Sequence, residues 1–221
     1  MQRIDQPSPN HDARPHGGPI DMLVLHYTGM WSADAALARL CDPQAKVSAH
    51  YAIDEDGTLY VLVPEERRAW HAGVSFWAGA TDINARSIGI ELVNPGHEFG
   101  YRVFPERQIA SLTMLVKDIL GRHPIPPARV LGHSDVAPAR KDDPGELFPW
   151  AWLAEAGIGV WPERQDSNLT AKALPLYGYD PAAPPEKVIL AFQRHFRPGK
   201  LDGVWDGECA GRLAGLLAKA K

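Results

Sequence analysis

Apolar and polar positions along the chain predict a mixed sheet surrounded by helices. Apolar runs at 22–27 and 87–93 have the length expected of buried strands. Residues 50–63 form two strand-like runs around Asp56-Gly57, a dipeptide typical of hairpin turns. Residues 129–131 are expected to form a short edge strand. Strands of this kind mixed with helices indicate an α/β fold, with a mixed β-sheet flanked by helices.

Helical periodicity is clearest at 105–120, where apolar residues recur every three or four positions and form one stripe. Pro105 suits the first turn of this helix. Shorter helices are expected at 148–156 and after Ser32, whose side chain can cap a helix that begins at the next residue. These apolar stripes predict packing against the sheet and carry no chemistry.

The periodic pattern stops in a segment of Gly, Pro and charged residues and resumes as two apolar helical stripes. The first twenty residues are rich in Pro, His, Gly and Asp, which predicts irregular structure. We therefore expect an irregular N-terminal arm at 1–20, a catalytic α/β domain at 21–157, a linker at 158–167 and a second, small helical domain at 168–221.

Composition narrows the classes of partner. The chain has 221 residues, of which 45% are apolar, and this is enough for a packed core. Its net charge of −4 and the absence of a Lys/Arg cluster argue against a nucleic acid partner. No stretch approaches the ~20 consecutive apolar residues of a membrane span.

The compartment is less clearly indicated. The N-terminal residues lack the apolar core of a signal peptide. Cys41 and Cys209 are too few for a disulfide framework, which fits a reducing environment. We expect the cytoplasm, and the cell envelope is the alternative if a leader is missing from this sequence. The oligomeric state is unknown.

Two histidines and a carboxylate are placed where a catalytic metal site could form. His26 ends a buried apolar run, His133 follows another, and Asp143 comes ten residues after His133. Two His and one carboxylate leave a coordination position open for water, as catalytic zinc requires. Alone, each histidine is more often a surface or core residue than a ligand, and the spacing is not a local motif such as HExxH.

Glu91 and Lys141 are the other candidates for chemistry. Glu91 interrupts the apolar strand SIGIELV, where a carboxylate is costly unless it is paired or functional. Burial there would raise its pKa, which suits a general acid or base. Lys141 precedes Asp143 by two and would share its face in an extended segment, where it could stabilise an oxyanion. A solvent-facing Glu and a solvated loop Lys are the alternatives.

Five sequence blocks occur in the order found in one family: LHYTG, VSAHYAIDEDG, AWHAG, SIGIELVN and GHSDVAPARKDDPG, at 25–29, 47–57, 69–73, 87–94 and 132–145. They resemble the zinc-dependent N-acetylmuramoyl-L-alanine amidases of the AmpD and AmiD type, which are related in fold to peptidoglycan recognition proteins. The resemblance covers roughly residues 20–155.

The resemblance implies a Zn²⁺ cofactor and a role for each matching residue. It implies His26, His133 and Asp143 as zinc ligands, Glu91 as the group that activates or positions the zinc-bound water, and Lys141 as the group that stabilises the oxyanion. Ala49 stands where some phage relatives carry a catalytic Tyr, so either that Tyr is not needed here or Tyr27 or Tyr51 takes its role. Residues that resemble substrate-groove positions are Trp70, His71, Asn84 and Arg86.

The C-terminal segment resembles the small three-helix peptidoglycan-binding module, through Phe192-Gln193-Arg194, Asp202-Gly203 and Gly207. The resemblance implies a second small three-helix domain that binds the wall polymer beside the catalyst. The alternative is a helical appendage that only packs on the first domain.

These features predict an enzyme that hydrolyses the amide between the lactyl group of N-acetylmuramic acid, or its 1,6-anhydro form, and L-alanine. Its partners would be peptidoglycan or muropeptide fragments, in wall recycling or turnover. The alternative is a non-catalytic peptidoglycan recognition protein. Such relatives typically lack a zinc ligand, whereas all three ligand positions are filled here. The sequence does not distinguish polymeric wall from small anhydro-muropeptides.

Overall fold

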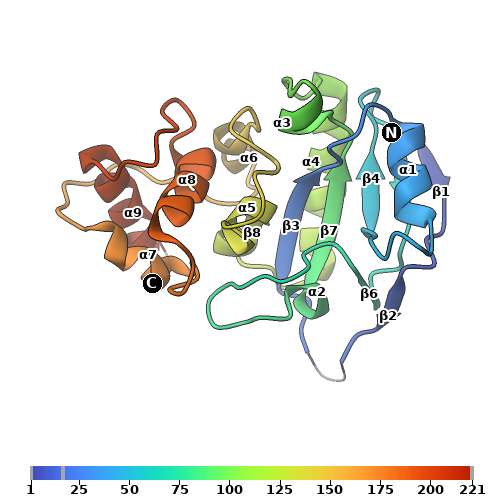
Figure 1. The fold of residues 1–221 in the computed structure, drawn as a ribbon, viewed down its shortest axis with the longest axis horizontal. Helices are drawn as coiled ribbons and strands as arrows, with labels where there is room; N and C mark the ends of the chain where they lie inside the picture. The colour runs from blue at the N-terminus through green and yellow to red at the C-terminus, as the bar shows by residue number, and fades with distance from the viewer. Residues whose placement is uncertain (1, 16–17, 220–221) are drawn as a thin grey trace.

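A six-stranded mixed sheet forms the centre of the catalytic part of the chain (Figure 1). The computed structural model describes residues 2–15 and 18–219. The strand order is β1-β5-β4-β7-β3-β8. These strands are β1 (Arg3–Asp5), β3 (Met22–Tyr27), β4 (Tyr51–Ile53), β5 (Leu59–Val61), β7 (Ser87–Leu92) and β8 (Val130–Gly132). The pair β4–β5 is antiparallel and the other neighbours are parallel, so the predicted mixed sheet is confirmed.

Helices surround the sheet and continue beyond it. They are α1 (Ala33–Cys41), α2 (Ile83–Arg86), α3 (Gly96–Phe99), α4 (Glu106–Arg122), α5 (His133–Val136), α6 (Trp150–Glu155), α7 (Leu174–Tyr177), α8 (Pro185–Phe196) and α9 (Gly207–Lys219), with short 3-10 turns η1 (Pro127–Arg129) and η2 (Ala171–Ala173). The Ser32 side chain caps α1, as predicted. None of the described helices is long and apolar enough to cross a bilayer.

The N-terminal twenty residues contain two short strands, where the sequence predicted an irregular arm. β1 adds to the sheet beside β5, and β2 (His11–Ala13) pairs with β6 (Arg67–Ala69). Between them, the buried Asn10 amide donates to the carbonyls of Asp42 and Val47. Three-residue edge strands are too short to produce an alternating pattern, so backbone pairing and not periodicity orders this segment.

Alternation along the central strands divides the sheet into two faces. Leu23, Leu25, Ile88 and Ile90 point to one face, where they pack against the apolar stripe of α4. On the other face, Met22 and Val24 belong to a second core. His26 continues that second face to the end of β3. The functional side chains therefore stand on the face opposite α4.

The helical unit of α7, α8 and α9 shares this second core. Tyr179, Phe192 and Phe196 from that unit form one apolar cluster with Met22, Val24 and other side chains of the catalytic part. Figure 1 shows the unit at the β8 side of the sheet, next to α5.

The segment predicted as a linker, 158–167, packs closely on α9. The Gln165 N–H donates to the Gly211 carbonyl. A Cβ at Gly215 would lie 2.0 Å from the Glu163 carbonyl oxygen, so only glycine permits this approach. The segment thus has no regular structure, and its Glu163 and Gln165 backbones nevertheless lie directly against α9.

Candidate metal centre and catalytic cavity

Three side chains from separate parts of the chain converge at the carboxyl ends of the parallel strands. The β3–β8 register aligns Leu25 with Gly132, so His26 and His133 follow as neighbours. Nδ1 of His26 lies 2.9 Å from Nδ1 of His133 and 3.0 Å from Oδ2 of Asp143. Nδ1 of His133 lies 3.1 Å from the same oxygen. All three residues are buried, and their ligand atoms could hold one metal ion.

The outer ring nitrogen of His133 fixes which nitrogen faces the centre. Nε2 of His133 lies 3.1 Å from the Ala72 carbonyl oxygen, which can only accept a hydrogen bond. Nε2 therefore carries the proton, and Nδ1 presents its lone pair to the centre. A hydrogen-bonded outer nitrogen of this kind is typical of metal-ligating histidines.

A longer chain of hydrogen bonds fixes the tautomer of His26. The Ser87 hydroxyl donates to the Ile83 carbonyl at 2.7 Å, so Oγ accepts from Nε2 of His71 at 3.1 Å. Nδ1 of His71 is then unprotonated and accepts from Nε2 of His26 at 3.1 Å. Nδ1 of His26 is consequently left with its lone pair toward Asp143. We call Ile83, Ser87, His71 and His26 the tautomer relay.

Glycine makes room for the tautomer relay within the sheet. A Cβ at Gly89 would lie 2.4 Å from Cγ of His71, so any side chain at this position would displace the imidazole. Gly89 and Glu91 stand on the same face of β7 because they are two residues apart. Gly89 of β7 therefore leaves space for the His71 ring, and Glu91, two residues later on the same face, supplies a carboxylate beside it.

The electrostatics of the centre favour a cation. Burial, together with the charge of His133, lowers the pKa of His26 to about 4, so its imidazole is neutral near pH 7. Burial alone would raise the pKa of Asp143, but its interactions with His133 and His26 outweigh this and lower it. Nδ1 of His26, Nδ1 of His133 and the Asp143 carboxylate thus face one another at short distances. Such an arrangement is stable when a metal ion occupies their common focus.

Glu91 lies beside the centre with an unpaired carboxylate. The β3–β7 register aligns it with His26. Its side chain is buried, and Oε2 has no hydrogen-bond partner among the described residues. Burial and the neighbouring Asp143 raise its pKa well above the ordinary value, and Lys141 opposes this shift. A carboxyl group in this setting can exchange a proton near neutral pH.

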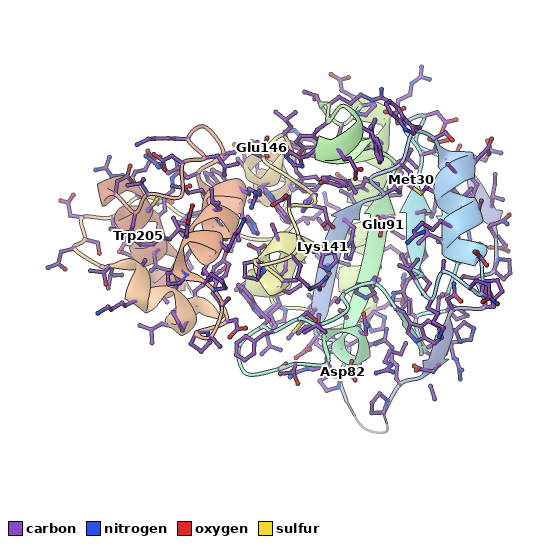
Figure 2. The ribbon with its side chains drawn as sticks, viewed as in Figure 1. Met30, Asp82, Glu91, Lys141, Glu146 and Trp205 are labelled. Carbon is purple, nitrogen blue, oxygen red and sulfur yellow. The ribbon has the colours of Figure 1, made fainter. Side chains whose placement is uncertain are left out.

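Glu91 and Lys141 line the same cavity as the three candidate ligands. Its volume is about 340 Å³, and it extends over Thr28, Gly29 and Met30 toward α1. Figure 2 shows Glu91 on β7 and Lys141 on the loop between the sheet and the helical unit. The arrangement brings a buried carboxylate and a lysine ammonium group next to the three candidate metal ligands.

Of the four predicted substrate-groove residues, only His71 reaches this cavity, and it belongs to the tautomer relay. Asn84 accepts the backbone N–H groups of His71 and Ala72, so it shapes the loop below the site. Arg86 forms an ion pair with Asp21. Trp70, half-buried, is also outside the set of described residues that line the cavity. Sequence blocks located these residues near the site without distinguishing a ligand contact from a supporting one.

Arg39 and Arg140 line the cavity although the sequence analysis did not select them. Arg39 is on the last turn of α1. Arg140 donates to the carbonyls of Ala72 and Val74, so it also holds the loop whose carbonyl orients His133. The only sequence feature that could have indicated Arg140 is its position directly before Lys141.

Comparisons with known proteins identify the family of this chain. The family model described as N-acetylmuramoyl-L-alanine amidase matches residues 16–146, which include the predicted ligands and Glu91. The chain belongs to the N-acetylmuramoyl-L-alanine amidase family. Among curated relatives, the N-acetylmuramoyl-L-alanine amidase AmiD of Escherichia coli strain K12 is 43% identical, over 90% of this chain and 83% of its own length. The 1,6-anhydro-N-acetylmuramyl-L-alanine amidase AmpD of the same strain is 37% identical, over 66% of this chain and 86% of its own.

Solved structures extend the similarity to the helical unit. AmpDh3 of Pseudomonas aeruginosa matches with a TM-score of 0.84 at 38% identity, and covers 93% of this chain and 94% of its own. AmiD of Escherichia coli matches with a TM-score of 0.82 at 40% identity, over 92% and 91% of the two chains. The chain is therefore an enzyme of the N-acetylmuramoyl-L-alanine amidase class. The alternative of a non-catalytic recognition protein is not supported.

Proposed function

We propose that this amidase uses Zn²⁺ to hydrolyse the amide between the lactyl group of a muramic acid unit and L-alanine. The observation that carries the proposal is the convergence of two imidazoles, one carboxylate and the unpaired Glu91 on one cavity. Tetrahedral ligands about 2.0–2.1 Å from zinc lie roughly 3.3 Å apart, close to the 2.9–3.1 Å separations of these atoms. His₂-carboxylate is also a ligand set of catalytic zinc sites.

Small anhydro-muropeptides are the proposed substrate class. A solved structure of AmiD from Escherichia coli is a complex with the substrate anhydro-N-acetylmuramic acid-L-Ala-D-gamma-Glu-L-Lys. A solved structure of AmpDh3 is a complex with anhydromuramic pentapeptide. The similarity of this chain to both supports a muropeptide substrate, in wall recycling or turnover.

In the proposed mechanism, Glu91 and Lys141 carry the proton transfer and the charge. Zinc would supply Lewis acidity, which polarises the carbonyl and makes water more acidic. Glu91, held unpaired next to His26, takes a proton from the attacking water and returns it to the departing nitrogen of L-alanine. Lys141 stabilises the negative charge that develops on the carbonyl oxygen. The tautomer relay and the Ala72 carbonyl keep both imidazoles oriented throughout.

The test is an endpoint assay on two substrates. The zinc-loaded protein is incubated with a 1,6-anhydro-muropeptide and with intact sacculi, each with and without a chelator, and mass spectrometry follows stem peptides that begin with free L-alanine. Zinc-dependent release supports the proposal, and the faster substrate identifies recycling or wall turnover. The matched control is zinc-loaded Glu91→Gln. Absence of release by folded, zinc-loaded wild type would overturn the proposal.

The cytoplasm is the proposed compartment, because Cys41 and Cys209 are free thiols. Fractionation of cells that express the native gene tests this, and recovery in the envelope fraction would contradict it. The division at 158–167 and wall binding by the helical unit also stay proposals. A sacculus pull-down with Glu91→Gln tests the latter, since this variant should bind without cutting.

A further inference from the structure

The motif that resembles a wall-binding module is turned inward in this chain. Phe192 is fully buried in the core shared with the sheet. Gln193 is also buried, and its amide holds the Asp202-Gly203 turn by accepting from both backbone N–H groups and donating to Asp202. Arg194 points at the catalytic part, where it pairs with Asp142 at 2.6 Å. The side chains of Phe192, Gln193 and Arg194 are therefore engaged within the protein and unavailable to an external ligand.

His195, the residue after Arg194 on α8, forms a hydrogen bond with Asp135. Asp135 is the third residue of α5, which begins with the candidate ligand His133. Oδ2 of Asp135 accepts from the Gly132 backbone N–H at 2.8 Å and from Nδ1 of His195 at 2.7 Å. Oδ1 accepts from the Tyr179 hydroxyl at 2.7 Å. Two donors from the helical unit thus hold a carboxylate that also caps the backbone just before His133.

The imidazole of His195 is fixed by stacking as well as by its hydrogen bond. Its ring lies 3.7 Å from the Trp150 ring centroid and 3.9 Å from that of Phe196. Both His195 and Asp135 are buried. The ring therefore has one orientation in which Nδ1 donates to Asp135.

The segment that carries the candidate ligand Asp143 is held by Arg194, the residue before His195 on α8. Asp142, the partner of Arg194, directly precedes the ligand Asp143 and directly follows Lys141. A backbone hydrogen bond of 2.9 Å from Ser134 N–H to the Asp143 carbonyl joins the two segments. Consecutive residues of α8 therefore contact both segments that carry metal ligands, within two residues of each ligand.

We propose that α8 is a positioning element of the active site, in which Arg194 and His195, with Tyr179, hold the segments that present His133, Lys141 and Asp143. The helical unit then contributes to metal affinity and catalysis through the geometry of these segments. The inference rests on the proposed metal site. It assigns positioning roles to Arg194, His195 and Tyr179, none of which reaches the metal.

The test measures zinc affinity by competition with a chromophoric chelator, using the full-length protein. His195→Phe removes the donor to Asp135 and keeps an aromatic ring, whereas His195→Asn keeps an N–H donor at nearly the same place. We expect the zinc dissociation constant to rise about tenfold in His195→Phe, by analogy with outer-shell partners of metal ligands, and to be largely restored in His195→Asn. Arg194→Gln and Tyr179→Phe should each raise it by several-fold.

Arg197→Gln is the matched control. Arg197 lies at the end of the same helix and pairs with Asp206 and Glu208, inside the helical unit. This variant should lower the unfolding temperature without changing zinc affinity. The Co²⁺-substituted proteins add a spectroscopic readout, because a displaced ligand alters the visible absorption bands.

Two results would overturn the inference. If His195→Phe and Arg194→Gln bind zinc as tightly as wild type and lose only thermal stability, like Arg197→Gln, the contacts are merely structural. If wild type itself binds no zinc, the proposed function fails together with this inference. Normal zinc binding by wild type combined with normal binding by the variants refutes the positioning role alone.

Discussion

The tautomer relay predicts that a serine without any metal contact controls metal affinity. Ser87→Ala removes the hydroxyl that accepts from Nε2 of His71. His71 can then keep its proton on Nε2, where it has lost its acceptor, or move it to Nδ1 and donate to His26. The second choice forces the proton of His26 onto Nδ1, where it donates to Asp143 and occupies the lone pair that a metal requires.

The size of the loss in metal affinity depends on whether the metal-free or the metal-bound variant can avoid an unpaired His71 N–H. The metal-free variant avoids it by changing the tautomers of both His71 and His26. The metal-bound protein cannot, so a buried N–H without an acceptor costs it about 1–3 kcal/mol. This difference corresponds to a roughly 5–150-fold increase in the metal dissociation constant. Both Ser87 and His71 are buried, which keeps bulk water from replacing the lost acceptor.

Chelator competition at fixed pH measures this change in metal affinity. Ser111→Ala is the matched control, because Ser111 is also buried and its hydroxyl donates to the Gly57 carbonyl, in a different part of the fold. Both variants should lose comparable thermal stability, and only Ser87→Ala should lose metal affinity. Unchanged affinity in Ser87→Ala would refute the assignment of protons along the relay.

Three further predictions concern turnover and acid stability. Glu91→Gln should keep metal binding and lower kcat by about 10²–10⁴-fold in an initial-rate assay on anhydro-muropeptide, and near-normal kcat would contradict the proton-transfer role. Lys141→Met should lower kcat by about 10²–10³-fold with little change in KM, and an effect confined to KM would instead indicate ground-state binding. Burial opposes ionisation of Glu65, but hydrogen bonds from Arg122 and Tyr51 lower its pKa from 4.5 to about 2. Its stabilisation, roughly 1–2 kcal/mol after allowance for solvent screening, is present above pH 4.5 and lost as the pH falls through 2. Urea unfolding of wild type and Glu65→Gln should therefore converge at low pH, and a pH-independent difference would contradict this account.

The central fold was predictable because its elements are long or strongly patterned. The buried run at 22–27, the hairpin around Asp56-Gly57 and the helix predicted at 105–120 all appear where expected. The N-terminal strands escaped prediction because they are held by backbone pairing across the sheet edge. The shared core was predicted only as the alternative of a helical appendage that packs on the first domain, since apolar stripes reveal that a helix packs but not against what.

The candidate ligands were found through sequence blocks, whereas their support was not. His26, His133 and Asp143 stand in conspicuous positions at strand ends, and the structure brings them together. His71 looked like a groove residue because its block adjoins the site, yet its partners Ser87 and His26 are separated from it along the chain. The direction of a hydrogen bond depends on which residues are neighbours in three dimensions, and the spacing of residues along the sequence does not reveal it.

The core that joins the sheet to α8 and α9 has a mechanical consequence. A flexible tether lets a binding module search a volume and raises local concentration over a range of geometries. Here the apolar cluster of Val24, Tyr179 and Phe192 packs the helical unit directly against the sheet, and the connecting segment packs on α9. Any polymer that touched both parts would have to match a single fixed spacing and angle. A polymer that bound both parts would therefore be selected by the shape it presents to this fixed arrangement.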